Sequence, residues 1–213
     1  MANELIFYTN PMSRGQIVRW MLEEVGAPYE QRLLDYGTTM KDAAYRAINP
    51  MGKVPAIVHD GRIVTECAAI CAYLADAFPD AKLAPPTAER AAYYRWLFFT
   101  AGPVEQAITA KHFGVEPDVD QQRMAGFGSL PAALDTLESA VAGKSFVAGD
   151  RFSAADVYVG SQIDWGLQFG TITPRPAFEA YVEPLRERAA YKRAKEIDGA
   201  LIAEIQAANP AAG

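Results

Sequence analysis

The sequence predicts an α/β domain followed by an all-helical domain. Short β-prone runs alternate with helical patterns up to about residue 80, and helical patterns dominate after it. The consecutive prolines Pro85 and Pro86 separate the two regions, because adjacent prolines cannot continue a helix. We therefore expect a first domain at residues 1–82, a linker at 83–87 and a helical domain at 88–213.

The first domain begins with a strand, a helix and a second strand. Leu5–Thr9 is a β-prone run that a turn at Asn10-Pro11 ends, and an apolar face at helical spacing follows from Arg14 to Val25. A second strand is predicted at Tyr29–Leu34 and a weaker helix at Met40–Ile48. This βαβ order favours parallel pairing of the two strands.

A hairpin and a helix complete the first domain. Asp60-Gly61 lies between the β-branched runs Val54–His59 and Arg62–Thr65, which is the strongest hairpin signal in the chain. Glu66–Phe78 then reads as a helix. The predicted order of elements is therefore βαβαββα.

The second domain reads as a helical bundle. Its clearest local signal is Ser153 followed by Asp156 three residues later, which resembles a capping box at the start of a helix. The predicted helices are Glu89–Thr109, Gln121–Ala142, Ser153–Phe169, Phe178–Ala189 and Tyr191–Ala207.

Composition excludes several classes of function. The net charge is −6 with no basic block, which argues against nucleic-acid binding. The longest apolar run, Cys67–Ala75, is far shorter than the ~20 residues of a membrane span. With no signal sequence at Met1–Glu4, the expected location is the cytoplasm. Two cysteines and two histidines supply too few ligands for a metal site, and Cys67 and Cys71, four residues apart on one helix, are not expected to pair.

The candidate binding residues lie in turns. The sequence has no glycine-rich dinucleotide loop, phosphate loop, nucleophile elbow or zinc-protease motif. Open α/β sheets bind ligands beyond the ends of their strands. The turns after the predicted strands are therefore the places to look for a site.

Six motifs stand out, three in the turns and helix start of the first domain and three in the helices of the second. They are Pro11-Met12-Ser13-Arg14-Gly15, Asn49-Pro50-Met51-Gly52-Lys53-Val54-Pro55-Ala56, Glu66-Cys67-Ala68-Ala69-Ile70, Phe152-Ser153-Ala154-Ala155-Asp156, Phe178-Glu179-Ala180-Tyr181 and Ala190-Tyr191-Lys192-Arg193-Ala194. These motifs resemble those of the cytosolic glutathione transferases, in particular bacterial members. The resemblance extends over nearly the whole chain and implies a thioredoxin-like first domain.

The resemblance implies a glutathione site in the first domain. A cis bond before Pro55 would let the Val54 backbone pair with the cysteinyl part of glutathione, and Lys53 would bind the glycyl carboxylate. Glu66 and Cys67 would start a helix whose free N–H groups receive the γ-glutamyl carboxylate. The family usually has serine where this chain has Cys67, and a thiol is only a weak donor. The alternative roles are an edge strand for Pro55, a solvated lysine for Lys53 and a small buried residue for Cys67.

Ser13 is the first candidate for stabilising the glutathione thiolate. It follows the turn after the first strand and precedes a helix, and its alternative role is that of a plain helix cap. Asn10, Arg14 and Tyr8 are rivals. Asn10 more often forms a turn, and strand alternation favours core packing of Tyr8. The sequence leaves the choice among the four open.

The second substrate would be an apolar electrophile bound between the domains. Arg95 and Arg123 are candidates for closing that site. The residues expected to line it are aromatic side chains on the predicted helices, which have core packing as their alternative: Tyr94, Phe98, Phe113, Trp165 and Phe169.

The function that the resemblance implies is conjugation of the glutathione thiolate to electrophiles, or reduction of a peroxide or disulfide, in a homodimer. Glutathione would be a co-substrate, and no metal is expected. Two alternatives remain. One is a non-catalytic protein that binds glutathione or a hydrophobic ligand, and the other is a specialised glutathione-dependent isomerase or dehalogenase.

Overall fold

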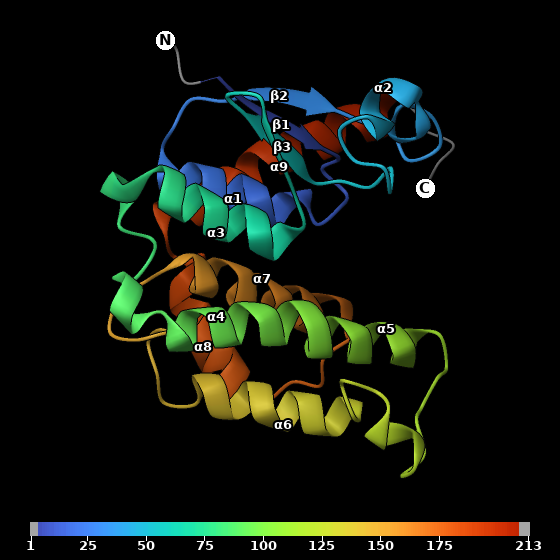
Figure 1. Ribbon diagram of the computed structural model, residues 1–213, viewed down its shortest axis with the longest axis vertical. Coiled ribbons are helices and arrows are strands. Elements are labelled where there is room, and N and C mark those ends of the chain that lie inside the picture. The colour runs from blue at the N-terminus through green and yellow to red at the C-terminus, as the bar shows by residue number, and fades with distance from the viewer. Residues whose placement is uncertain (1–3, 209–213) are drawn as a thin grey trace. The chain divides into compact units, whose positions relative to one another are not determined.

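A computed structural model describes residues 4–208, and the chain divides into two compact units (Figure 1). Unit 1 contains the chain up to Ala81 and again from Arg188 onward, and unit 2 is Lys82–Glu187. The predicted domains also include residues 1–3 and 209–213, which lie outside the described residues. The predicted linker at 83–87 falls at the beginning of unit 2 and stays a prediction.

Unit 1 is built on a mixed sheet in the order β2-β1-β3-β4 within the described residues. Strand β1 is parallel to β2 and antiparallel to β3, and β3 forms the expected hairpin with β4. The predicted thioredoxin-like βαβαββα order is confirmed. The elements are β1 (Leu5–Thr9), α1 (Gly15–Val25), β2 (Glu30–Leu33), α2 (Ala43–Arg46), β3 (Ala56–His59), β4 (Arg62–Thr65), α3 (Cys67–Ala77) and α9 (Ala189–Ala208).

Strand β1 is buried on both faces. Ile6 and Tyr8 join a core cluster with Met40 and Tyr45, which come from the segment that contains α2. On the opposite face, the Phe7 ring centroid lies 5.1 Å from the guanidinium carbon of Arg19 on α1. Because successive side chains of a strand point to opposite faces, this central strand holds both layers of unit 1 together.

Helix α9 belongs to unit 1, which differs from the sequence expectation that residues 88–213 form one domain. It packs against α1, as does α3, and the three helices are seen side by side in Figure 1. The indole ring of Trp20 meets the Tyr191 ring edge to face at 5.1 Å, and Asp198 is buried against Arg19. The helical pattern predicts that α9 is a helix, but the partner that covers its buried face comes from the far end of the sequence.

Unit 2 is helical, with two interruptions that the sequence analysis did not place. Residues Thr100–Val104, which contain Pro103, form a π-helical turn between α4 and α5. The helix expected from Gln121 onward starts only after Gly126 and Gly128, with Ser129 as its cap. The helices are α4 (Ala91–Phe99), α5 (Glu105–His112), α6 (Leu130–Val141), α7 (Ala154–Phe169) and α8 (Pro176–Arg186).

The predicted capping box at the start of α7 is confirmed and is part of a larger buried network. The Asp156 carboxylate accepts hydrogen bonds from the Ser153 backbone N–H at 2.8 Å and from its hydroxyl at 3.0 Å. It also accepts from the Val147 N–H and the Tyr181 hydroxyl, both at 2.7 Å. Burial raises the pKa of Asp156, and these four hydrogen bonds favour its charged form.

Candidate functional site

The register of the sheet places three of the predicted motifs along one edge of the sheet, the edge formed by the ends of β1, β3 and β4. Tyr8 lies opposite Ala56, and Ala56 lies opposite Thr65. The turn after β1, the residues just before β3 and the start of α3 just after β4 therefore meet there. A hydrogen bond joins the starts of α1 and α3 directly, because the Cys67 Sγ donates to the Arg14 carbonyl oxygen at 3.4 Å.

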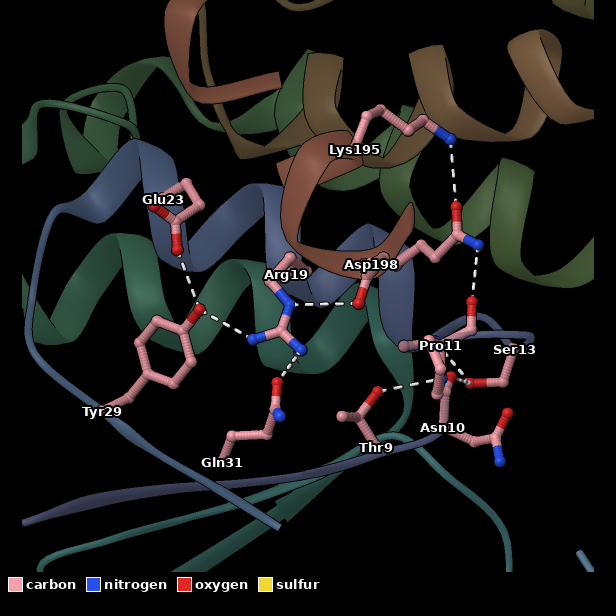
Figure 2. A network of polar contacts seen from close by, with 12 residues as sticks. Thr9, Asn10, Pro11, Ser13, Arg19, Glu23, Tyr29, Gln31, Lys195 and Asp198 are labelled. Atoms are coloured by element: carbon pink, nitrogen blue, oxygen red, sulfur yellow. Dashed lines mark hydrogen bonds and ion pairs between the residues drawn. The ribbon is translucent and has the colours of Figure 1, made fainter. Parts of the chain in front are cut away.

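The turn between β1 and α1 is held by its own side chains. The Asn10 amide donates to the Leu34 carbonyl at 2.8 Å, and its oxygen accepts from the Met12 N–H at 3.0 Å. The Ser13 hydroxyl donates to the Asn10 carbonyl at 2.6 Å and accepts from the Gly15 N–H at 2.9 Å. Asn10 and Ser13 therefore fix the shape of the turn (Figure 2).

The thiolate candidates differ in what their polar groups contact. Ser13 is 9% exposed, and its proton faces the Asn10 carbonyl, so a bound thiolate would have to replace that acceptor. The Tyr8 hydroxyl accepts from Arg32 at 3.2 Å, and the Tyr8 ring belongs to the core on the other face of the sheet. Arg14 is exposed at the start of α1. The assignment of Ser13 stays a prediction.

The segment before β3 contains a cis peptide bond between Val54 and Pro55, as the family resemblance implies. Within the described part of the chain, the backbone N–H and C=O of Val54 make no hydrogen bond. The Lys53 carbonyl just before it accepts from the Tyr45 hydroxyl at 2.6 Å and from the Asn49 amide at 2.8 Å. Lys53 is thus held in place while the Val54 main chain stays available to a ligand.

Sequence reasoning missed these two supports of Lys53. In the sequence, Asn49 stands out only as part of the motif Asn49–Ala56, and Tyr45 only as part of a weak helix. Burial is the largest cause that raises the pKa of Tyr45, to about 12, so its hydroxyl remains a donor at neutral pH. Lys53 itself has an exposed side chain.

The first turn of α3 presents backbone N–H donors at the same edge of the sheet as the Ser13 turn and Val54. The first helical bond runs from the Ile70 N–H to the Glu66 carbonyl at 2.8 Å, so the N–H groups of residues 67–69 lie in the turn that has no intrahelical acceptors. Glu66 has a φ of +66°, which is uncommon for a residue other than glycine, and its side chain is exposed. Cys67 is buried beside the Arg14 carbonyl, as the small-residue alternative expects.

Neither Cys67 nor Cys71 forms a disulfide bond within residues 4–208. Cys71 lies one turn after Cys67 and is fully buried, and burial raises the pKa of its thiol. A buried neutral thiol is a poor nucleophile. Cys71 therefore belongs to the core of unit 1.

The five predicted aromatic residues all lie in unit 2, and most are exposed. Trp165 is half-buried, and its ring contacts that of Phe169 edge to face at 6.2 Å. Arg95 is exposed on α4 with its guanidinium 4.5 Å from the centroid of the neighbouring Trp96 ring, and Arg123 is exposed and paired with Asp120. The exposed members of the aromatic set are Tyr94, Phe98, Phe113 and Phe169.

A cavity of about 470 Å³ lies within unit 2, between the end of α5, the start of α6 and residues 173–175. Its walls include Val115, Phe127, Leu134 and the cations Lys111 and Arg175. None of the five predicted aromatic residues lines it. Their role in binding an electrophile stays a prediction.

The described residues contain no candidate metal centre and no membrane-spanning helix. No group of three or more histidine, cysteine, aspartate or glutamate side chains comes together in residues 4–208. Over the same residues, no helix has both the length and the apolar character needed to cross a bilayer.

Solved structures with the same fold include proteins that bind glutathione. A glutathione transferase from Methylococcus capsulatus strain Bath matches with a TM-score of 0.76 and 30% identity, over 92% of this chain and 98% of that one. A sphingomonad glutathione S-transferase, solved in complex with glutathione, matches with a TM-score of 0.74 and 28% identity over 91% and 98% of the two chains.

Sequence comparisons agree with the fold. A glutathione S-transferase of Escherichia coli O157:H7 is 31% identical over 57% of this chain and 61% of its own length. A probable glutathione S-transferase of rice (Oryza sativa subsp. japonica) is 30% identical over 82% and 80% of the two chains. Residues 12–77 match the N-terminal domain of the glutathione S-transferases, and residues 105–165 match their C-terminal domain. With both domain types present in order on the matching fold, the chain belongs to the glutathione S-transferase family.

Proposed function

We propose that the protein is a glutathione transferase that binds glutathione as the thiolate and conjugates it to hydrophobic electrophiles. The observation that carries the proposal is the meeting of three segments at one edge of the sheet: the Ser13 turn, the available Val54 backbone and the first turn of α3. Glutathione is an extended anionic tripeptide with one thiol, so its site needs main-chain partners, anion donors and a thiolate stabiliser.

Each part of glutathione has a partner in this arrangement. The Val54 N–H and C=O pair with the cysteinyl backbone, and the N–H groups at the start of α3 receive the γ-glutamyl carboxylate. The exposed Lys53 ammonium binds the glycyl carboxylate. Glu66 binds the α-amino group of the γ-glutamyl residue, and Cys67 contributes its backbone.

The reaction is a nucleophilic displacement. The glutathione thiol loses its proton to solvent on binding, and the sulfur then attacks the electrophilic carbon. A carbon–sulfur bond forms, and the bond to the leaving group breaks with its electron pair. The exposed aromatic side chains of α4 and α7 are the proposed contacts of the apolar electrophile.

The energetics assign Ser13 a partial role. Acting at neutral pH requires lowering the thiol pKa from ~8.5 by about two units, which corresponds to about 3 kcal/mol. A hydrogen bond to a charged acceptor contributes about 1.5–3 kcal/mol, but Ser13 gives up a neutral bond of about 0.5–1.5 kcal/mol to Asn10. The start of α1 adds about 0.3–1 kcal/mol. At the midpoints of these ranges Ser13 and the helix together contribute about 2 kcal/mol, so the proposal includes a smaller contribution from other groups.

The test is an ultraviolet titration of bound glutathione, which follows the absorbance of the thiolate against pH. The wild-type protein is expected to ionise the bound thiol below about pH 7.5, and Ser13→Ala to raise that pKa by about one unit. Ser129→Ala is the matched control, because Ser129 also caps a helix but lies in unit 2. Binding without a shifted thiol pKa would indicate a non-catalytic binding protein, and no binding would refute the proposal.

We also propose that two chains form a homodimer, as the family resemblance implies. Light scattering on the purified protein is expected to give twice the 23.2 kDa mass of the chain. A monomer that turns over electrophiles would refute this part of the proposal alone.

A further inference from the structure

A lysine on the last helix reaches the Ser13 turn through one intermediate side chain. The Lys195 ammonium on α9 donates to the Gln16 amide oxygen at 3.0 Å, and the Gln16 amide nitrogen donates to the Pro11 carbonyl at 2.6 Å. Figure 2 shows this line of contacts running from Lys195 to the turn beside Ser13. All of these residues belong to unit 1.

The chemistry of the lysine fixes the direction of the chain of hydrogen bonds. An ammonium group has three donors and no acceptor, so Gln16 must present its oxygen to Lys195. Its NH₂ group is then the end that faces Pro11. The Pro11 carbonyl, which can only accept, requires the same orientation of the Gln16 amide, so Lys195 and Pro11 together fix it from both ends.

The Pro11 carbonyl is an effective place to hold the turn. Proline has no backbone N–H, so the carbonyl is the one backbone group through which residue 11 can be bonded. The residue on one side of Pro11 is Asn10, whose carbonyl accepts the Ser13 proton. The Pro11 carbonyl belongs to the Pro11–Met12 peptide, which lies in the chain between the Asn10 carbonyl and Ser13, so a rotation of this peptide changes where the Ser13 hydroxyl sits.

Other polar contacts attach α9 and the residue just before it to α1, away from the Ser13 turn. Arg193 pairs with Glu23 at 2.8 Å, and Arg188 pairs with Glu24 at 2.6 Å. Both glutamates lie in the last turns of α1, whereas Gln16 lies in its first turn. Docking of α9 and restraint of the Ser13 turn can therefore be tested separately.

We propose that Lys195 is a positioning residue for the glutathione thiolate, acting through Gln16 and the Pro11 carbonyl to hold the Ser13 hydroxyl toward the sulfur. The inference rests on the proposed function, because it requires that glutathione binds beside this turn. The charge of Lys195 acts on Asp198, one turn along α9, and the charges of Arg19 and Glu23 on α1 act on the same carboxylate. The Tyr191 ring packs 5.5 Å from the ammonium.

The test compares Lys195→Met with Arg193→Met, which removes a cation from the same helix but leaves the contact with Gln16. Each variant is titrated with glutathione, for the pKa of the bound thiol, and with S-methylglutathione, which has no ionisable thiol. Lys195→Met is expected to lower the thiolate fraction at pH 6.5 by about threefold to tenfold while the Kd for S-methylglutathione stays within twofold. Arg193→Met is expected to leave both unchanged.

Two further variants separate positioning from stability. Lys195→Arg retains a donor-only cation and is expected to restore most of the thiolate fraction. Gln16→Leu is expected to reproduce the effect of Lys195→Met, and the double variant to add little, because both act through the same line of contacts. Urea unfolding measures how much stability each variant loses.

The inference is overturned if Lys195→Met leaves the thiol pKa at the wild-type value, or if Arg193→Met shifts it equally. A shift that follows the loss of stability across the set, with no rescue by Lys195→Arg, also overturns it. These results leave the proposed function intact. If the wild-type protein binds glutathione without ionising the thiol, or does not bind it, both the inference and the proposed function fail.

Discussion

The Nε of Arg19 donates to Oδ1 of Asp198 at 3.2 Å, in a pair whose side chains are only 1% and 3% exposed. Arg19 also donates to the Tyr29 hydroxyl at 2.8 Å and to the Gln31 side chain (Figure 2). No group in the described part of the chain donates a hydrogen bond to the second, buried oxygen of Asp198. This ion pair joins the first helix of the chain to the last, and its charges are balanced only while both partners are present.

Arg19→Met is expected to destabilise the protein by about 3–5 kcal/mol, because it leaves the Asp198 carboxylate buried and unpaired. Arg19→Met with Asp198→Asn is expected to recover part of that loss. Urea unfolding of Arg19→Met, Asp198→Asn, the double variant and the wild type measures the coupling energy between the two side chains. Equal losses for Arg19→Met and the double variant would contradict the prediction.

The loss caused by Arg19→Met should also depend on pH. Burial raises the pKa of Asp198, while Arg19 and Lys195 lower it, so removing Arg19 raises it further. A carboxyl whose folded pKa lies above its unfolded value favours the folded state below the unfolded pKa, and this contribution is lost as pH rises through the folded pKa. The deficit of Arg19→Met against wild type is therefore expected to be larger at pH 7.5 than at pH 5.

Gly15→Ala is expected to destabilise unit 1 by about 1–3 kcal/mol through overpacking at the start of α1. A Cβ at Gly15 would overlap the Thr9 hydroxyl oxygen and would lie 3.0 Å from that of Ser13. Thr9→Ala should therefore rescue part of the stability in the double variant. Gly199→Ala, on α9 with open space around its Cβ, is the control and is expected to be neutral or slightly stabilising.

Tyr45→Phe is expected to cost about 1 kcal/mol of stability and to weaken glutathione binding by about twofold to tenfold, because the Lys53 carbonyl loses one of its two side-chain donors. Tyr73→Phe is the matched control, since that hydroxyl bonds to His59 at the other end of β3. Calorimetric titration with glutathione measures both. An equal change in affinity for the two variants would contradict the role given to Tyr45.

Asp156→Ala is expected to destabilise the protein by at least about 3 kcal/mol, because the Ser153 and Val147 backbone N–H groups and the Tyr181 hydroxyl lose their acceptor inside unit 2. Ser153→Ala removes only one donor to that carboxylate and is expected to cost about 1 kcal/mol. Thermal unfolding of the two variants checks the order. A smaller loss for Asp156→Ala than for Ser153→Ala would contradict it.

The elements of unit 1 were predictable because each has a local cause. The Asp60-Gly61 turn requires positive φ at both residues, which the structure shows, and Gly26 ends α1 in the left-handed conformation. The Ser153 and Asp156 capping box is also a local signal. Such signals fix where an element begins and ends.

What the sequence could not provide is the partner of a buried polar group. An arginine in a helix is usually exposed to solvent. Nothing near Arg19 in the sequence indicates Asp198, Tyr29 or Gln31 as its partners. The contact of Lys195 with Gln16 was missed for the same reason. The motif residues of the site were identifiable, but the acceptor that holds the Ser13 proton depends on how the turn closes.

The return of α9 to unit 1 sets an order of events during synthesis. The 179 positions that separate Arg19 from Asp198 take roughly 10–35 s to translate at ~5–20 residues per second. Until then the nascent first unit contains a guanidinium group with no carboxylate to neutralise it and a face of α1 with no cover. Unit 2 is continuous in sequence, so all of its residues have been synthesised before α9 is made. Unit 1, whose synthesis begins earlier, is therefore completed after unit 2.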